Sequence, residues 1–279
     1  MSDSYVEVMS RHQAEASRLD QQFDLLTKNL SYLVHPEIAQ RLPPNPRIAD
    51  VGTGTGIFLH MLAPVYSSAT LDGYDLSPAL FYPPSSRPPN VNLSTLDARQ
   101  PVPPALRGTY DLVHVRLIAA GLQPDEWSSV VQNLAQLLKP GGAMQWEECN
   151  FIGVQHYRGQ PESTVAAARF MGRLFRDGLQ TRFSHGWSTL PQDMKAAGLE
   201  QVQEDIVSSD RLPETRKALT ANGMTAIFSW ARLMASKGAP GALSSERLDE
   251  LERQAEADIQ SGCYVRFDIH VSWGFLPNP

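Results

Sequence analysis

The sequence predicts an α/β fold in which short, mostly parallel strands alternate with helices in a doubly wound sheet. Two observations carry this prediction. Short apolar runs, such as those over residues 47–51 and 110–115, alternate with segments whose apolar residues recur at helical spacing. The first apolar run enters a turn with glycine at three alternate positions, and a helix follows the turn. Sheets of this kind bind ligands at the carboxyl ends of their strands.

The glycine-rich turn contains Gly52, Gly54 and Gly56 and is preceded by Asp50. Glycine serves where the backbone takes a positive φ or where a ligand must come closer than a Cβ allows. The dinucleotide fingerprint needs glycine or alanine where Ile57 stands, and the Gly-Lys-Ser/Thr ending of a phosphate loop is absent. Asp50 would repel a phosphate but could bind an ammonium group, directly or through water. The turn therefore predicts a nucleotide-like cofactor that carries an amino-acid moiety.

The stretch Asp50-Val-Gly-Thr-Gly-Thr-Gly56 resembles motif I of the class I S-adenosylmethionine (SAM) dependent methyltransferases. A Leu-Lys-Pro-Gly-Gly turn ending at position 142 is a second feature of that family. The resemblance covers roughly residues 20–150 and the final strand. It implies a Rossmann-like sheet of seven strands, the last one antiparallel, with SAM held by Asp50, Gly52, Thr53, Gly54 and Gly56. The alternative is a glycine-rich turn that holds no ligand.

The second predicted strand, over residues 70–75, ends in an acid. Asp75 stands nineteen positions after Gly56, close to the ~20 expected for an acid that accepts hydrogen bonds from ribose hydroxyls. Asp72 competes for this role, although it falls inside the strand. The resemblance further implies that Leu76 packs on the adenine of the cofactor.

The third predicted strand, over residues 91–96, is followed by Asp97 and Ala98. The resemblance implies that Asp97 takes the adenine amino group, with Ala98 beside it. A simple turn residue is the alternative for Asp97, because aspartate is common in turns. Between the second and third strands, proline and serine over residues 81–89 predict a short helix or a loop.

The fourth predicted strand reads Tyr-Asp-Leu-Val-His-Val-Arg and ends at Arg116. This pattern resembles fungal secondary-metabolism methyltransferases, which implies that Val115 and Arg116 lie beside the methionine part of the cofactor. We interpret His114 as a structural histidine within the sheet. Adjacent residues of a strand point to opposite faces, so at most one of Glu147 and Glu148 faces the site. That residue orients a substrate, or both are solvated residues at the sheet edge.

A general base would help a hydroxyl acceptor lose its proton, and histidine is the usual choice. His185 is the first candidate, because it lies on a predicted loop beside glycine and aromatic residues. The alternative is a histidine that packs or caps locally. His156 and His12 are the next candidates, and Glu148 is the carboxylate candidate.

The chain is divided into an N-terminal helical cap (1–45), a SAM-binding core (46–150), a lid segment (151–200) and the remaining core strands with inserted lid helices (201–279). A helix over 5–34, ended by Pro36, either folds over the cofactor or packs on the sheet. Lys139 to Gly142 are expected to end a helix before a strand over 144–149. Helices near 214–236 and 244–260 follow a strand over 201–207, and an amphipathic strand closes the chain over 265–273.

The net charge of −6, without a basic run, favours a small-molecule substrate over nucleic acid or an anionic membrane. The two cysteines, Cys149 and Cys263, lie too far apart in sequence to suggest a metal site or a disulfide framework. We expect a cytoplasmic monomer or homodimer.

The expected activity is methyl transfer from SAM to a hydroxyl, before nitrogen or sulfur, of a small and largely apolar secondary metabolite. Two other functions stay open. One is a SAM-binding protein that regulates or catalyses cyclisation without methylating. The other is an NAD-linked oxidoreductase.

Overall fold

A computed structural model describes Glu7, Met9 and residues 13–278. It forms two compact units. The first comprises Met1–Ser31, Asn150–Ser184 and Val207–Ile269, and the second comprises Tyr32–Cys149, His185–Ile206 and His270–Pro279. The division into cap, core and lid stays a prediction.

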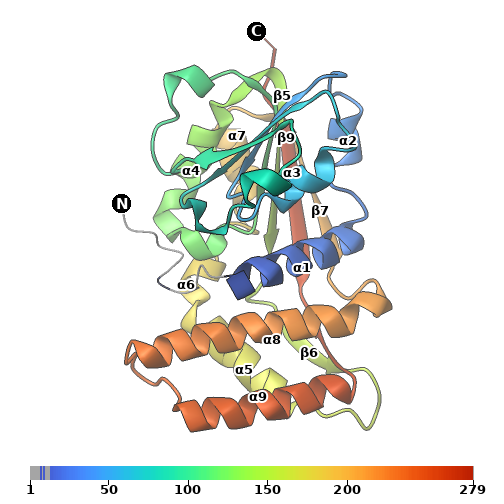
Figure 1. Ribbon diagram of the computed structural model, residues 1–279, viewed down its shortest axis with the longest axis vertical. Helices are drawn as coiled ribbons and strands as arrows, with labels where there is room; N and C mark the ends of the chain where they lie inside the picture. The colour runs from blue at the N-terminus through green and yellow to red at the C-terminus, as the bar shows by residue number, and fades with distance from the viewer. Residues whose placement is uncertain (1–6, 8, 10–12, 279) are drawn as a thin grey trace. The chain divides into compact units, whose positions relative to one another are not determined.

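A mixed sheet of seven strands has the order β3-β2-β1-β4-β5-β9-β7, and the first five of these strands run parallel (Figure 1). Its strands are β1 Arg47–Val51, β2 Thr70–Asp75, β3 Val91–Thr95, β4 Tyr110–Arg116, β5 Leu138–Cys149, β7 Glu200–Ser208 and β9 Asp268–Phe275. Gly141 and Gly142 pair with Leu276, whereas Asn150 pairs with Asp268, so β9 is antiparallel to β5. The predicted doubly wound sheet with an antiparallel last strand is confirmed.

Helices cover both faces of this sheet within the second unit: α2 Pro36–Ala39, α3 Ile57–Leu62, α4 Trp127–Ala135 and α7 Leu190–Ala196. One face carries His114, which stacks on Phe58 of α3. The other face carries Trp146, whose ring contacts Trp127 of α4. β4 is buried along nearly its whole length, as its continuous apolar run predicts.

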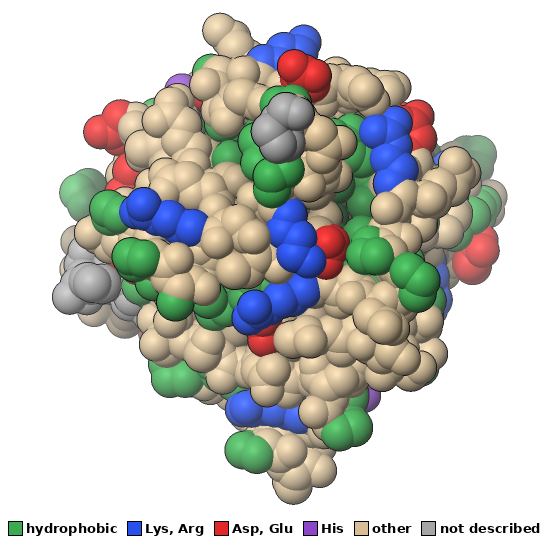
Figure 2. Space-filling model, turned by 90° about the horizontal axis from the view of Figure 1, so that it is seen from above, with side chains coloured by type: hydrophobic (Ala, Val, Ile, Leu, Met, Phe, Trp, Pro, Cys, Tyr) green, Lys and Arg blue, Asp and Glu red, His purple; other side chains and the backbone are tan. Residues whose placement is uncertain are grey.

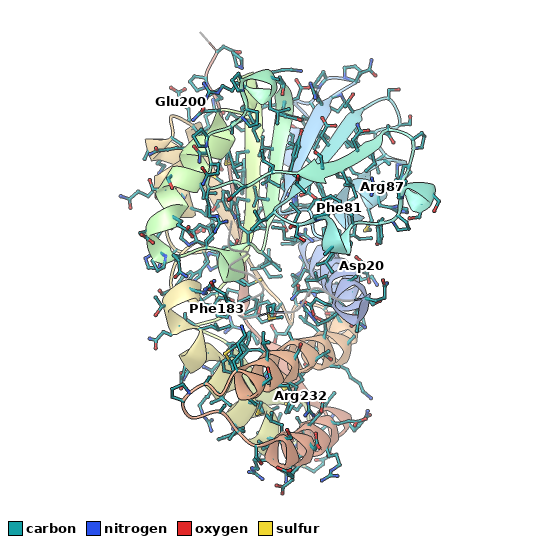
Figure 3. The ribbon with its side chains drawn as sticks, turned by 60° about the vertical axis from the view of Figure 1, so that its left-hand side comes forward. Asp20, Phe81, Arg87, Phe183, Glu200 and Arg232 are labelled. Carbon is teal, nitrogen blue, oxygen red and sulfur yellow. The ribbon has the colours of Figure 1, made fainter. Side chains whose placement is uncertain are left out.

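The first unit contains five helices in its described part: α1 Gln13–Leu30, α5 Ala166–Gly178, α6 Gln180–Phe183, α8 Pro213–Ser236 and α9 Ser245–Gln260. It also holds a two-stranded antiparallel sheet of β6 Gln155–Arg158 and β8 Cys263–Arg266. On α8, Arg232 donates hydrogen bonds to Asp249 and Glu252 of α9 (Figure 3). No helix in the described part of the chain has both the length and the apolar character that a bilayer crossing needs.

The expected helix stop at Lys139–Gly142 is wrong. α4 already ends at Ala135, and residues 138–142 belong to β5. Gly141 takes a φ of 77°, and a Cβ on Gly142 would lie 2.9 Å from the carbonyl oxygen of Tyr110. The two glycines therefore permit an irregular, close pairing of β5 with its neighbours, which a helix-stop reading of Pro-Gly-Gly overlooks.

The expected amphipathic last strand is also wrong. The alternating stretch is divided between β8, in the small sheet, and β9, in the large one. β9 lies between β5 and β7, and successive residues from Ile269 to Phe275 are all buried, Ser272 included, so both of its faces are covered. The small sheet was not predicted at all, because β6 is only four residues long.

The N-terminal helix ends earlier than predicted. α1 stops at Leu30, Ser31 takes a φ of 72°, and Pro36 begins α2 instead of ending α1. Proline suits the first turn of a helix because that position needs no hydrogen-bonded N–H. Between β2 and β3 the chain forms only two short 3-10 turns, as expected, and Phe81 and Arg87 lie on this segment (Figure 3).

Candidate cofactor and acceptor site

The glycine-rich turn joins β1 to α3 and takes a conformation that only glycine adopts readily. Gly52, Gly54 and Gly56 have φ values of 74°, 59° and 94°. The N–H groups of Gly52 and Thr53 both donate to the carbonyl oxygen of Tyr74 in β2. The turn is therefore anchored to the neighbouring strand by its backbone.

The three glycines differ in the space around them. A Cβ on Gly52 would lie 2.4 Å from Cγ2 of Ile118, and one on Gly56 would lie 3.0 Å from Cδ1 of Leu93. A Cβ on Gly54 would meet nothing within 4 Å among the described residues. Packing within the protein thus explains the first and third glycines, whereas Gly54 leaves open space at the tip of the turn.

Asp50 is 3% exposed, and one of its carboxylate oxygens has a partner in the turn and the other a partner in the sheet. The Thr53 hydroxyl donates to Oδ2 over 2.6 Å, and Oδ1 lies 2.7 Å from Nδ1 of His114. Asp50 therefore ties the strand before the turn to the turn itself. Contact with an ammonium group, directly or through water, stays a prediction.

Asp75 joins the two loops that follow β1 and β2. Its Oδ2 accepts the Gly54 N–H at 3.0 Å, and its Oδ1 accepts the Ser77 N–H at 3.1 Å. Asp75 ends β2, the position from which a carboxylate accepts hydrogen bonds from ribose hydroxyls in sheets of this kind, and that contact stays a prediction. Leu76 beside it is half-buried.

The competing acid, Asp72, is committed elsewhere. It accepts hydrogen bonds from Arg47, Asn92 and the Tyr110 hydroxyl, which lies 2.9 Å from its Oδ2. These contacts favour Asp75 for the ribose role.

Asp97 and Ala98 follow β3, as predicted, but Asp97 has local partners. The Arg99 backbone N–H donates to its Oδ1, and the Arg99 guanidinium contacts both carboxylate oxygens at 2.8 and 2.9 Å. Burial alone would raise the pKa of Asp97, but the hydrogen bonds from Arg99 lower it below its ordinary value. This geometry is that of the turn-residue alternative, and an adenine contact stays a prediction.

The ends of β4 and β5 bring Val115, Arg116, Glu147 and Glu148 together. Val115 is fully buried, and Arg116 Nε lies 2.5 Å from Oε2 of Glu147. Burial alone would raise the pKa of Glu147, but the charges of Arg116 and His114 lower it to about 2. Glu147 is therefore a buried carboxylate on the face of the sheet that α3 covers.

Glu148 faces the opposite side, as the alternation of a strand predicts. Its Oε1 accepts hydrogen bonds from the Ile118 N–H at 2.9 Å and from Nε1 of Trp146 at 3.2 Å. Its Oε2 is buried and has no hydrogen-bond partner in the part of the chain that the structure describes. Burial raises the pKa of Glu148 to about 8, so a protonated carboxyl is favoured at neutral pH. Both glutamates are 1% exposed, so neither is a solvated edge residue.

The candidate bases are dispersed. His185 is half-buried in the loop between α6 and α7, and it belongs to the same unit as the glycine turn. His156 lies in β6 of the other unit, where burial lowers its pKa to about 4. His12 lies outside the described residues. A catalytic role for His185 or Glu148 stays a prediction.

The contacts of His114 with Asp50 and Glu147 were not predicted from the sequence. This side chain is 1% exposed and lies between Asp50 of β1 and Glu147 of β5. The signal was present in the alternation of His114 and Arg116, which places both on one face of β4 beside Glu147.

Charged side chains on the surface seen from above lie singly or in small groups, several of them with a basic residue beside an acidic one (Figure 2). No group of three potential metal ligands occurs among residues 7, 9 and 13–278. The site described above is therefore built from backbone groups, buried carboxylates and one imidazole.

Comparisons with known proteins show the family to which the chain belongs. A family model described as a methyltransferase domain matches residues 48–142, from β1 into β5. The methyltransferase grgD of a Penicillium species is 34% identical over 81% of each chain. The N-methyltransferase tcpN of Claviceps purpurea is 31% identical over 90% of each chain.

Two further comparisons are more partial. The secondary metabolism regulator laeA of Fusarium oxysporum f. sp. lycopersici is 29% identical over 62% of this chain and 55% of its own. The solved structure of phosphoethanolamine N-methyltransferase 2 from Haemonchus contortus, in complex with phosphomonomethylethanolamine and S-adenosylhomocysteine, has a TM-score of 0.51 at 14% identity. It covers 90% of this chain and 53% of its own, and it shares the fold. The identity to grgD and tcpN across four fifths or more of both chains shows that this chain belongs to the class I SAM-dependent methyltransferases, with SAM as its cofactor.

Proposed function

We propose that this enzyme methylates a nitrogen atom of a small secondary metabolite, with SAM held at the turn between β1 and α3. The name of tcpN, an N-methyltransferase, favours nitrogen over the hydroxyl acceptor that the sequence suggested. A hydroxyl of a largely apolar metabolite is the second candidate, because a buried carboxyl and a loop histidine stand in the same unit as the turn. The absence of a basic run favours a small acceptor over nucleic acid.

The observation that carries the proposal is the open space at Gly54, next to Asp75. The turn presents no Cβ there, and the Gly54 N–H donates to Oδ2 of Asp75, which stands at the carboxyl end of β2. These features fit an adenosyl group whose ribose hydroxyls donate to Asp75 while its backbone-facing side approaches Gly54. We assign Leu76, Asp97 and Ala98 to the adenine end.

The amino-acid end of the cofactor is assigned to Asp50, Gly52 and Thr53, with Val115 and Arg116 on the next strand. Asp50 supplies negative charge near an ammonium group, and Arg116 supplies positive charge near a carboxylate. Both side chains already have internal partners, so we infer that they bind through their remaining capacity or through water.

Bound SAM supplies an activated methyl group on a sulfonium leaving group. The work left to the protein is to hold the acceptor in line with that methyl, where effective molarity contributes ~7–11 kcal/mol of the barrier. An amine acceptor must be neutral to attack, and a hydroxyl must lose its proton. We propose His185 as the group that takes this proton, with Glu148 as the second candidate in its ionised form, near or above pH 8.

The test compares Gly54→Ala with Gly198→Ala. Both glycines have a positive φ, 59° and 88°, and a Cβ at either position meets nothing within 4 Å of the described chain. Each alanine should therefore cost a similar ~1–2 kcal/mol of folding stability. Only Gly54→Ala should weaken SAM binding measured by calorimetry, by about tenfold or more. Equal SAM affinity in both variants would remove the turn from the cofactor site.

The second candidate class, a SAM-binding regulator without transfer activity, is favoured by the similarity to laeA. Incubation with labelled SAM and a panel of amine and phenol acceptors separates the two classes. Formation of S-adenosylhomocysteine that depends on the acceptor supports transfer. Binding of SAM without turnover across the panel supports the regulator.

A further inference from the structure

His114 lies in β4, between β1, which leads into the glycine-rich turn, and β5. In the strand register it stands beside Asp50 of β1 on one side and beside Gln145 of β5 on the other. Its Nδ1 lies 2.7 Å from Oδ1 of Asp50, and its Nε2 lies 3.4 Å from Oε1 of Glu147. Each ring nitrogen of His114 therefore faces a carboxylate oxygen.

Two acceptors require two donors. A neutral imidazole carries one N–H, whereas the imidazolium carries an N–H on each ring nitrogen. Burial alone would lower the pKa of His114, but hydrogen bonds and charge from Asp50 and Glu147 outweigh it and raise the pKa above its ordinary value. The two carboxylate acceptors favour the charged form of the ring, and the raised pKa is in the same direction.

The surrounding charges balance. The ionisable groups that face the ring are Asp50 from β1 and Glu147 from β5, and Arg116 on β4 pairs with Glu147. Two cations then stand against two carboxylates inside the sheet, as buried charges require. Beyond them, Gln145 donates to Glu147 at 2.7 Å, and the nearby charge of Glu147 adds to burial in raising the pKa of Tyr32.

The ring also contacts the helix that follows the turn. The imidazole of His114 stacks on Phe58 of α3, with ring centroids 3.7 Å apart and planes 10° from parallel. The strand before the turn is held through Asp50, which in turn accepts the Thr53 hydroxyl inside the turn. The His114 side chain thus contacts Asp50 in β1, just before the turn, and Phe58 in α3, just after it.

We propose that His114 is a positioning residue for methyl transfer: as an imidazolium it clamps the β1–α3 turn from both sides and keeps it in the conformation that binds the cofactor. This inference rests on the assignment of the turn to SAM. His114 itself touches no reacting atom in this proposal. It acts through Asp50, Thr53 and Phe58.

The experiment measures the SAM dissociation constant of the wild type, His114→Asn and His60→Asn between about pH 6 and pH 9. His60 is the matched control, because it is an exposed histidine on α3 itself. Asparagine at position 114 can donate to Asp50 but cannot bridge to Glu147 or carry a charge. We expect it to weaken SAM binding about tenfold or more near pH 6, while His60→Asn stays within about twofold of the wild type.

The pH profile separates positioning from simple packing. The amino group of SAM titrates identically in all three proteins, so it cancels in the ratio of dissociation constants. For His114→Asn this ratio should fall as the pH rises through the raised pKa of His114, because the wild type then loses its clamp too. A ratio that is constant with pH, or equal to one throughout, would overturn the inference.

Titration of the His114 ring in the wild-type protein tests the proposal without relying on how a variant binds SAM. Nitrogen NMR of histidine-labelled protein, with the His114 signal identified by its loss in His114→Asn, should show this ring protonated at both nitrogens at a pH above its ordinary pKa. A His114 signal with a single N–H at pH 6 would contradict the proposal. If Gly54→Ala keeps full SAM affinity, the cofactor assignment itself fails. If only the His114 results fail, the cofactor assignment stands.

Discussion

Replacement of Glu148 by glutamine should make the protein more resistant to alkaline pH. The side chain is 1% exposed, and its Oε2 meets no hydrogen-bond partner in the described residues. An ionised carboxylate in that position is shielded from bulk solvent, and no cation of the described residues compensates its charge. Glutamine keeps the shape and an oxygen that accepts the Ile118 N–H and the Trp146 indole N–H, but it never ionises.

The magnitude follows from the pKa of Glu148, which burial raises from 4.5 to about 8. A group with a raised folded-state pKa contributes stability that is complete below its unfolded pKa and is lost as the pH rises through the folded pKa. At ~1.4 kcal/mol for each pKa unit, the rise in the pKa of Glu148 from 4.5 to about 8 corresponds to about 5 kcal/mol in the free energy of unfolding. The wild type should lose this amount relative to Glu148→Gln between about pH 4.5 and pH 8.

The assay is urea unfolding of both proteins at pH 5, 6, 7 and 8, with the free energy of unfolding extrapolated to water. Other titrating groups contribute equally to both proteins, so the difference isolates position 148. The difference should grow by roughly 1 kcal/mol for each pH unit in favour of glutamine. A difference that stays constant from pH 5 to pH 8 would refute the reasoning, because it would mean that Glu148 is ionised in the folded protein at both extremes.

Two further predictions concern the helical unit. Asp258, which is 4% exposed on α9, accepts the N–H groups of Ala167 and Ala168 at the start of α5, so Asp258→Ala should lower the free energy of unfolding by about 1–3 kcal/mol. Asp249→Ala, on the exposed side of the same helix, should cost under ~1 kcal/mol in the same urea titration. Burial and the charge of Arg169 lower the pKa of His156 from 6.5 to about 4, so the wild type should lose up to ~3 kcal/mol as the pH falls between these values. His156→Gln should show no such loss in acid unfolding followed by circular dichroism, and equal acid sensitivity of both proteins would contradict this assignment.

The parallel part of the sheet could be predicted from local signals alone. Each of the strands β1 to β4 is a short run bounded by turn residues, and the prediction placed them within a residue or two of their observed bounds. The glycine-rich turn could also be predicted from the sequence, because few residues other than glycine adopt a positive φ readily. Asp75 followed from chain order, since parallel strands bring their carboxyl ends to one edge.

The antiparallel part of the fold depended on contacts between distant segments. Residues 138–142 contain a Pro-Gly-Gly sequence that ends helices in many chains, but here Gly142 approaches Tyr110 of β4, and Gly141 pairs with Leu276. Neither partner is visible in the local sequence. The central position of β9 similarly depends on β5 and β7, which pair with its two edges only in the folded sheet.

Glu147 and Glu148 show which properties of a residue the sequence pattern predicts and which depend on its surroundings in the fold. Strand alternation predicted correctly that they face opposite sides, and it said nothing of what each side contains. On one side, Arg116 and His114 hold Glu147 as a carboxylate with a pKa of about 2. On the other, Trp146 and the Ile118 N–H leave Glu148 without a cation, and its pKa rises to about 8. Two identical residues in sequence thus become a fixed negative charge and a neutral acid, because the two faces of one strand meet different helices. A role in proton transfer therefore falls more naturally to Glu148, whose pKa lies near neutral pH, whereas Glu147 serves to hold the imidazolium beside the cofactor turn.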